Sequence, residues 1–174
     1  MRALALSAGL GAMALLSMMT PTAGADPANG SVVFAIGKCW NPSEPVVERP
    51  AKVLYNCDGT SLMQEMTWTS WGPDGAQGTG IDTSIECQPN CAVGPVLVNP
   101  IIVRAWNPKP AGVQGCPAGV EFYNDMTIAY PQGVPPWIKP GMQWDRDTEF
   151  VTVDGMPTVR FSNMGAYTCT PLGQ

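Results

Sequence analysis

Residues Leu62–Glu86 read LMQEMTWTSWGPDGAQGTGIDTSIE and carry the strongest fold signal in the chain. Two strand-like runs, Leu62–Trp71 and Ala76–Glu86, flank the sequence Trp71-Gly72-Pro73-Asp74-Gly75. Proline presets φ and glycine tolerates positive φ, so this composition favours a tight turn. The stretch therefore predicts an antiparallel β-hairpin that turns at residues 71–75.

The strand after this turn has little side-chain volume on one face. Ala76, Gly78 and Gly80 are two residues apart, so they lie on the same side of a strand. An indole from Trp68 or Trp71 can cover such a glycine strip and stabilise the hairpin. We expect this packing role for the two tryptophans rather than an exposed recognition surface.

Short apolar runs separated by Gly, Pro, Asn and Asp continue along the chain, which has 19 glycines and 18 prolines. Because the runs have the period of strands, they predict an all-β fold: a disulfide-tied antiparallel β-sandwich or barrel of about eight short strands. The other expected strands are Ser31–Ile36, Ala51–Tyr55, Val96–Trp106, Val120–Tyr130, Glu149–Val153 and Thr158–Phe161. Pro100 predicts that its strand lies at an edge or carries a bulge, because proline donates no hydrogen bond to a neighbouring strand.

The first residues have the features of a secretory leader. Arg2 precedes an apolar stretch that runs from about Ala3 to Met19, and the small residues Ala23-Gly24-Ala25 follow. This order predicts a signal peptide over residues 1–25; an uncleaved membrane anchor is disfavoured because no stop-transfer charge cluster follows. Residues 26–174 then form a single secreted domain, extracellular or at the cell wall, without a stable membrane anchor.

All six cysteines follow this leader: Cys39, Cys57, Cys87, Cys91, Cys116 and Cys169. An even number of cysteines in an exported chain predicts disulfides. Zinc is the weaker interpretation, because residues 87–91 form a CxxxC and the chain has no histidine. Sequence alone leaves several pairings open. We prefer Cys39–Cys57, Cys87–Cys91 and Cys116–Cys169, which fasten both chain ends to the core; a link from Cys57 to Cys87 or Cys91 would contradict this set.

The net charge and the absence of histidine limit the functions that the protein can have. Once Arg2 is removed, eight basic side chains face fourteen acidic ones, so nucleic acid and anionic membranes are poor partners. Without histidine, Ser-His-Asp and Cys-His catalysis are excluded, and Ser61 and Ser70 lack a G-x-S-x-G motif. An enzyme would need paired carboxylates, for which the candidates are Glu65, Glu86, Glu121 and Asp125. Their spacing singles out no pair, so we expect a protein that is not an enzyme and holds no cofactor.

Two segments of the carboxyl-terminal third invite a binding role. Asp145-Arg146-Asp147-Thr148-Glu149 spaces three carboxylates two residues apart, but it is no complete EF-hand loop, so we expect a hydrated acidic loop and no metal. The Pro-rich segment Val134–Pro140, with Gln143-Trp144 beyond it, is the best candidate binding surface. Its ligand-binding residues are Trp137 and Trp144, since rigid aromatics stack on sugar or peptide at low ordering cost. The alternative is that they close the end of the sandwich.

Four motifs occur in order between Cys57 and Val103: Cys57-Asp58-Gly59, Trp68-Thr69-Ser70-Trp71-Gly72, Ala76-x-Gly78-x-Gly80 and Cys87-x-Pro89-x-Cys91-Ala92-x-Gly94. In these motifs the chain resembles small exported proteins of actinobacteria, of the mycobacterial and streptomycete type, whose function is generally unassigned. The resemblance implies an exported Gram-positive-type protein and supplies no catalytic residues. Cys39, Cys116, Cys169 and the Pro-rich carboxyl-terminal third lie outside it.

These observations favour a secreted, non-catalytic module that binds a cell-envelope glycan, a host molecule or another protein. A small secreted carboxylate hydrolase is the alternative, with an inhibitor or structural protein as a third class. Binding predicts clustered exposed aromatics, whereas hydrolysis predicts a cleft with two carboxylates of opposed pKa shifts. Joint burial of Trp106, Trp137 and Trp144 would count against binding.

Overall fold

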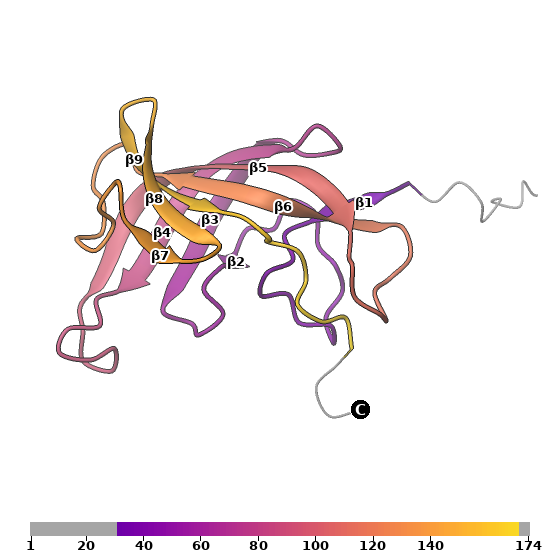
Figure 1. Cartoon of the computed structure of the whole chain (residues 1–174), viewed down its shortest axis with the longest axis horizontal. Helices are drawn as coiled ribbons and strands as arrows, with labels where there is room; N and C mark the ends of the chain where they lie inside the picture. Colours follow the sequence, from indigo (N-terminus) through magenta and orange to yellow (C-terminus); the bar gives the residue numbers. More distant parts are fainter. Residues whose placement is uncertain (1–30, 171–174) are drawn as a thin grey trace, which may run out of the picture.

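The computed structural model describes residues 31–170, so the leader predicted over residues 1–25 lies outside the described part. Nine strands make up the described fold (Figure 1): β1 (Val33–Ala35), β2 (Val53–Leu54), β3 (Ser61–Ser70), β4 (Ala76–Ile85), β5 (Val96–Pro110), β6 (Val120–Ala129), β7 (Gln143–Asp145), β8 (Thr148–Val153) and β9 (Met156–Phe161). Within residues 31–170, no helix is long and apolar enough to cross a membrane.

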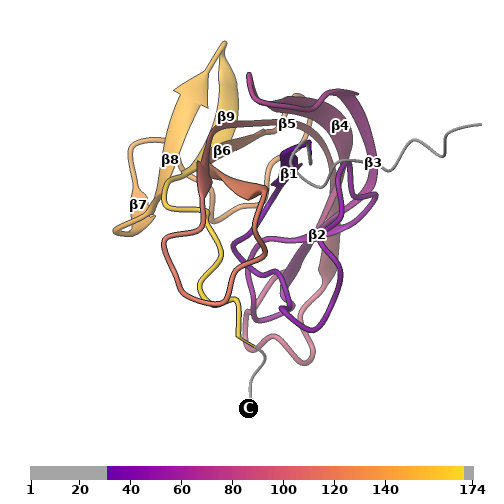
Figure 2. The ribbon, with the colours of Figure 1, turned by 90° about the vertical axis from the view of Figure 1, so that its right-hand side faces the viewer.

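The strands join in one curled sheet. Their order is β2-β3-β4-β5-β6-β9-β8-β7, every neighbour along it is antiparallel, and β1 pairs in parallel with the start of β6. Figure 2 shows the sheet as an arch, with β8 and β9 on one side and β3 and β4 on the other. The predicted all-β antiparallel class is confirmed, and its shape is a half-barrel rather than two stacked sheets.

All eight predicted strands are present, with ends within a few residues of those expected. The strand that sequence reasoning missed is β7, whose three residues are all exposed and therefore show no alternation of apolar and polar residues. Pro100 lies in the part of β5 that precedes the first residue paired with β6, Ile102. That part has β4 alone as a neighbour in the sheet, so the edge prediction holds locally, although β5 as a whole is an inner strand.

The hairpin of β3 and β4 forms as predicted, and the Gly75 amide donates to the Gly72 carbonyl across the turn at 3.0 Å. Gly78 lies so close to Trp68 that a Cβ there would be 2.7 Å from the indole ring. The Trp68 indole N–H donates to a backbone carbonyl, as does that of Trp71. Trp68 therefore covers the glycine strip at Gly78, which confirms the packing role, while Met66 covers Gly80.

Residues of the central strands β5 and β6 form the core. Ile101, Val103 and Ala105 of β5 are buried, as are Met126 and Ile128 of β6. The intervening β5 residues face outward, where Trp106 is 38% exposed. This alternation is what a sheet with one covered face requires.

Three disulfides tie the loops to this sheet, and their pairing confirms the preferred set. Cys39–Cys57 joins the segment after β1 to the segment after β2, with a Cα–Cα distance of 5.1 Å. Cys116–Cys169 ties the β5–β6 loop to the carboxyl-terminal segment, and Cys87–Cys91 closes a short loop after β4. No cysteine within residues 31–170 is free. Three disulfides indicate an oxidising, extracellular-type compartment.

Candidate functional site

A pocket of about 470 Å³ lies where the curl brings the two edges of the sheet toward each other. At one edge, Tyr55 and Asn56 follow β2; at the other, Trp144 belongs to β7. The ends of β4 and β6, the inward residues of β8 and β9, and loop residues that include Lys38 and Trp137 also line it. The pocket is therefore a product of the curl rather than of any one loop.

Six aromatic side chains line this pocket: Tyr55, Tyr130, Trp137, Trp144, Phe150 and Phe161. The rings of Tyr55 and Phe161 meet edge to face with centroids 5.7 Å apart, and those of Trp144 and Phe150 do so at 6.0 Å. Such pairs hold the rings in place and leave the remaining ring surface for a ligand.

The structure brings the two predicted ligand-binding tryptophans to this one pocket. Trp137 is half-buried against the core, whereas Trp144 is 62% exposed at the pocket's edge. With Trp106 also partly exposed, the joint burial that would count against binding does not occur. A ligand-binding role for Trp137 and Trp144 stays a prediction.

Asp82 of β4 lies behind the pocket lining and is fully buried. The Tyr55 hydroxyl donates to its Oδ1 at 2.7 Å, and the Tyr130 hydroxyl donates to its Oδ2 at 3.0 Å. The Ser84 hydroxyl also donates to Oδ2. Burial raises the pKa of Tyr55 and of Tyr130, and the nearby Asp82 carboxylate raises the pKa of both further. The carboxylate thus holds three lining side chains in a dry hydrogen-bonded cluster.

Sequence reasoning missed Asp82, although a signal for it existed. The spacing of Ala76, Gly78 and Gly80 places them on one face of β4, and the same alternation continues to Asp82 and Ser84. Because the small residues face the core, an aspartate in phase with them is expected to be buried as well. A buried carboxylate needs donors, and tyrosine hydroxyls are suited to that role.

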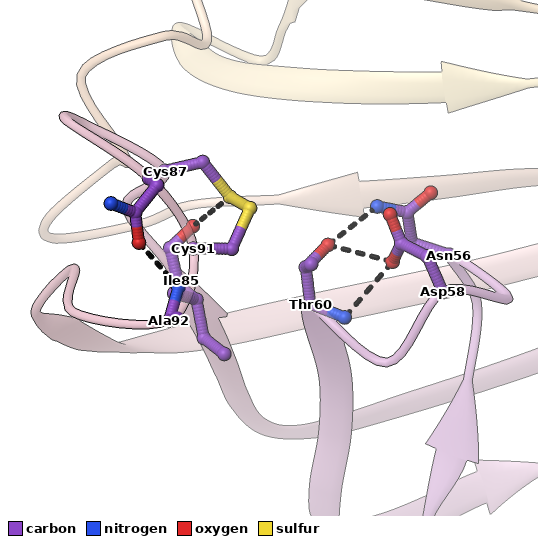
Figure 3. Close-up of a disulfide and its surroundings, with 8 residues drawn as sticks. Asn56, Asp58, Thr60, Ile85, Cys87, Cys91 and Ala92 are labelled. Carbon is purple, nitrogen blue, oxygen red and sulfur yellow. Dashed lines mark hydrogen bonds between the residues drawn. A yellow bond between two sulfur atoms is a disulfide. The ribbon is translucent and has the colours of Figure 1, made fainter.

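The lining also has a polar part, here called the mouth, which comprises Asn56, Asp58 and Thr60 and the start of the small disulfide loop at Cys87. Figure 3 shows these residues together with the Cys87–Cys91 disulfide. Asp58 Oδ1 accepts from the backbone amide of Thr60 at 2.9 Å and from its hydroxyl at 2.7 Å, and Asn56 Nδ2 donates to the Thr60 hydroxyl oxygen at 3.0 Å. The Ile85 amide donates to the Thr60 carbonyl, which links this cluster to the strand that leads into Cys87. These contacts make the mouth a defined rim rather than a set of loose side chains.

Lys38 is the one cationic side chain among the residues that line the pocket. Its ammonium lies 4.8 Å from the centroid of the Phe161 ring. Burial lowers the pKa of Lys38, while the negative charges of Asp145 and Asp147 act in the opposite direction. Within residues 31–170, no carboxylate lies within 4.0 Å of this ammonium.

Of the four carboxylates considered for catalysis, Glu86 alone lines the pocket. Glu65 is exposed at a bulge of β3, and Asp125 accepts a hydrogen bond from Asn107 outside the pocket. Glu121 lies in the β6 segment paired with β1. The four residues are therefore spread over the sheet and form no common site.

The three carboxylates of the acidic loop have different side-chain partners. Asp147 pairs with Arg146, Glu149 pairs with Arg160 at 3.0 Å, and Asp145 lines the pocket. No group of three or more His, Cys, Asp or Glu side chains within residues 31–170 is placed to hold a metal ion.

This chain matches no protein-family model, no curated protein and no solved structure. Its function therefore has to be inferred from the pocket.

Proposed function

We propose that this protein is a secreted, non-catalytic module that binds a small, largely apolar molecule in the pocket inside its curled sheet. The observation that supports this proposal is the lining of six aromatic side chains around about 470 Å³. Small-molecule sites are typically concave, rich in aromatic side chains and about 300–1,000 Å³ in volume. The disulfides are consistent with secretion, because such crosslinks persist in oxidising compartments.

The shape of the site narrows the ligand classes expected from the sequence. A glycan or a protein partner usually needs a long groove or a broad surface, whereas this lining converges on one pocket between the sheet edges. The fully buried Asp82 accepts hydrogen bonds from three hydroxyls and so fixes these side chains in the wall. These features favour binding of a small molecule over hydrolysis by a carboxylate pair.

The test is titration of the disulfide-bonded protein with a neutral apolar dye, N-phenyl-1-naphthylamine, whose fluorescence rises in apolar surroundings. We expect a saturable increase at one dye per chain. Replacing Trp144 by alanine removes one wall of the pocket and should weaken binding by about tenfold, equivalent to about 1.4 kcal/mol. Because Trp144 is 62% exposed, this replacement leaves the fold intact, which circular dichroism checks.

Trp106→Ala is the matched control, because Trp106 is also partly exposed but faces outward from β5 and does not line the pocket. Its dye affinity should equal that of the unmodified protein. Non-saturable binding, or an equal loss of affinity in both variants, would contradict the proposal.

A further inference from the structure

Three hydroxyls in the wall of the pocket have already committed their only proton. The hydroxyls of Tyr55, Tyr130 and Ser84 each donate to Asp82. A hydroxyl has a single proton, so these three groups present only oxygen lone pairs to anything else. Each hydroxyl is held in that orientation because Asp82 is fully buried and a buried carboxylate needs hydrogen-bond donors.

The mouth repeats this pattern. The Thr60 hydroxyl donates its proton to Asp58 at 2.7 Å, and the Asn56 side-chain amide donates to Thr60 at 3.0 Å (Figure 3). Three carboxylates line the pocket, those of Asp58, Glu86 and Asp145. Ionised carboxylates are acceptors only. These hydroxyl and carboxylate groups therefore offer acceptors to a ligand, while Lys38, Ser61 and Gln88 are lining residues that carry donors.

The charges of the lining residues also favour a cationic ligand. Three carboxylates and one ammonium line the pocket, and the whole chain has a formal net charge of −5. An anionic ligand would have to approach against this field, while a cation is drawn toward it. The aromatic walls add to this preference, since the face of an aromatic ring attracts a cation.

Lys38 provides an example of such an interaction within the chain. Its ammonium lies over the Phe161 ring at 4.8 Å, with Asp145 and Asp147 as its acidic neighbours. The wall of the pocket thus already accommodates one alkylammonium group on an aromatic face. Lys38 is also the lining residue that would pair with an anionic ligand. Replacing Lys38 should therefore weaken the binding of an anion and strengthen the binding of a cation.

We propose that the pocket selects a small organic cation, a protonated primary amine carried on an apolar body. This inference rests on the proposed binding function and specifies its ligand class. The apolar body packs among the aromatic rings, and the ammonium protons meet the acceptor groups of the wall and the mouth.

The test uses three probes that share an indole ring and an ethylene linker and differ in the end group. Tryptamine carries an ammonium, tryptophol a hydroxyl and indole-3-propionate a carboxylate. Calorimetric titration of the disulfide-bonded protein should give the tightest binding for tryptamine, about tenfold tighter than for indole-3-propionate. The tryptamine affinity should fall as salt is added, because exposed charges are screened.

Two substitutions sharpen this ranking. Lys38→Gln should raise the affinity for tryptamine about threefold, because it removes a like charge from the pocket. Glu86→Gln should lower the tryptamine affinity about threefold and leave that of tryptophol unchanged. Glu65→Gln is the matched control, because it makes the same change in net charge on an exposed residue outside the pocket.

The outcomes distinguish the two proposals. Equal binding of the three probes, or a failure of all three alongside saturable dye binding, overturns the cation inference and leaves the apolar pocket standing. Tightest binding of indole-3-propionate, lost in Lys38→Gln, also overturns it in favour of an anionic ligand. If the neutral dye does not bind at all, the proposed function itself fails.

Discussion

Alkaline pH should unfold this protein steeply, because two tyrosine hydroxyls are committed to a buried carboxylate. Burial and the Asp82 carboxylate raise the pKa of Tyr55 and of Tyr130 in the folded state, whereas in the unfolded chain both titrate near about pH 10. Above that pH the unfolded state loses protons that the folded state keeps. The contribution of these two tyrosines to the free energy of unfolding is therefore constant below about pH 10, and it falls as the pH rises further.

The loss of unfolding free energy per pH unit depends on how many tyrosines keep their proton in the folded state. Each buried tyrosine contributes about 1.4 kcal/mol per pH unit, so Tyr55 and Tyr130 together contribute about 2.7 kcal/mol per pH unit. Two pH units then remove about 5 kcal/mol, which is the entire stability of a weakly stable domain. Neither group needs a discount for solvent, because their side chains are only 7% and 2% exposed.

The assay is denaturant unfolding at a series of pH values, followed by tryptophan fluorescence, with tyrosinate absorbance recorded in parallel. Tyr130→Phe should lower the slope by about 1.4 kcal/mol per pH unit, even if it also lowers the stability at neutral pH. Tyr167→Phe is the control, because Tyr167 is 64% exposed and solvent screens its surroundings, so the slope should change far less. The reasoning is refuted if the slope is the same in Tyr130→Phe, or if four tyrosines ionise near about pH 10 while the fold stays native.

Two further predictions concern stability. Replacing both cysteines of the Cys116–Cys169 disulfide, which are 53 residues apart, by alanine should cost about 4 kcal/mol, against about 2 kcal/mol for the Cys87–Cys91 disulfide, with a separation of 4. Equal denaturant midpoints for the two double variants would contradict this ranking. Gly78→Ala places a Cβ 2.7 Å from the indole that covers the glycine strip and should cost about 1–3 kcal/mol. Gly112→Ala, whose Cβ meets nothing within 4 Å, should change the melting temperature little, and an equal drop in both variants would rule out the clash.

Local features of the sequence were sufficient for the strands and the crosslinks. The strand boundaries follow from alternation and from turn residues, and the hairpin of residues 62–86 follows from its Gly-Pro-Asp-Gly turn. The disulfide set could be chosen because linking nearby cysteines and fastening the chain end is the simplest pairing. Strand β7 was not predicted, because its three exposed residues show no alternation of apolar and polar side chains. They form a strand only through pairing with β8.

The sequence by itself determined an all-β, disulfide-bonded chain and pointed to Trp137 and Trp144. Only the tertiary structure decided that these tryptophans share a pocket, and that Tyr55 and Tyr130 meet Asp82 from 27 and 48 residues away. The physical reason is that alternation specifies which face of a strand a residue occupies, but not which strands the curl of the sheet brings together. The aromatic pocket therefore forms through long-range strand pairing, which alternation within one strand does not specify.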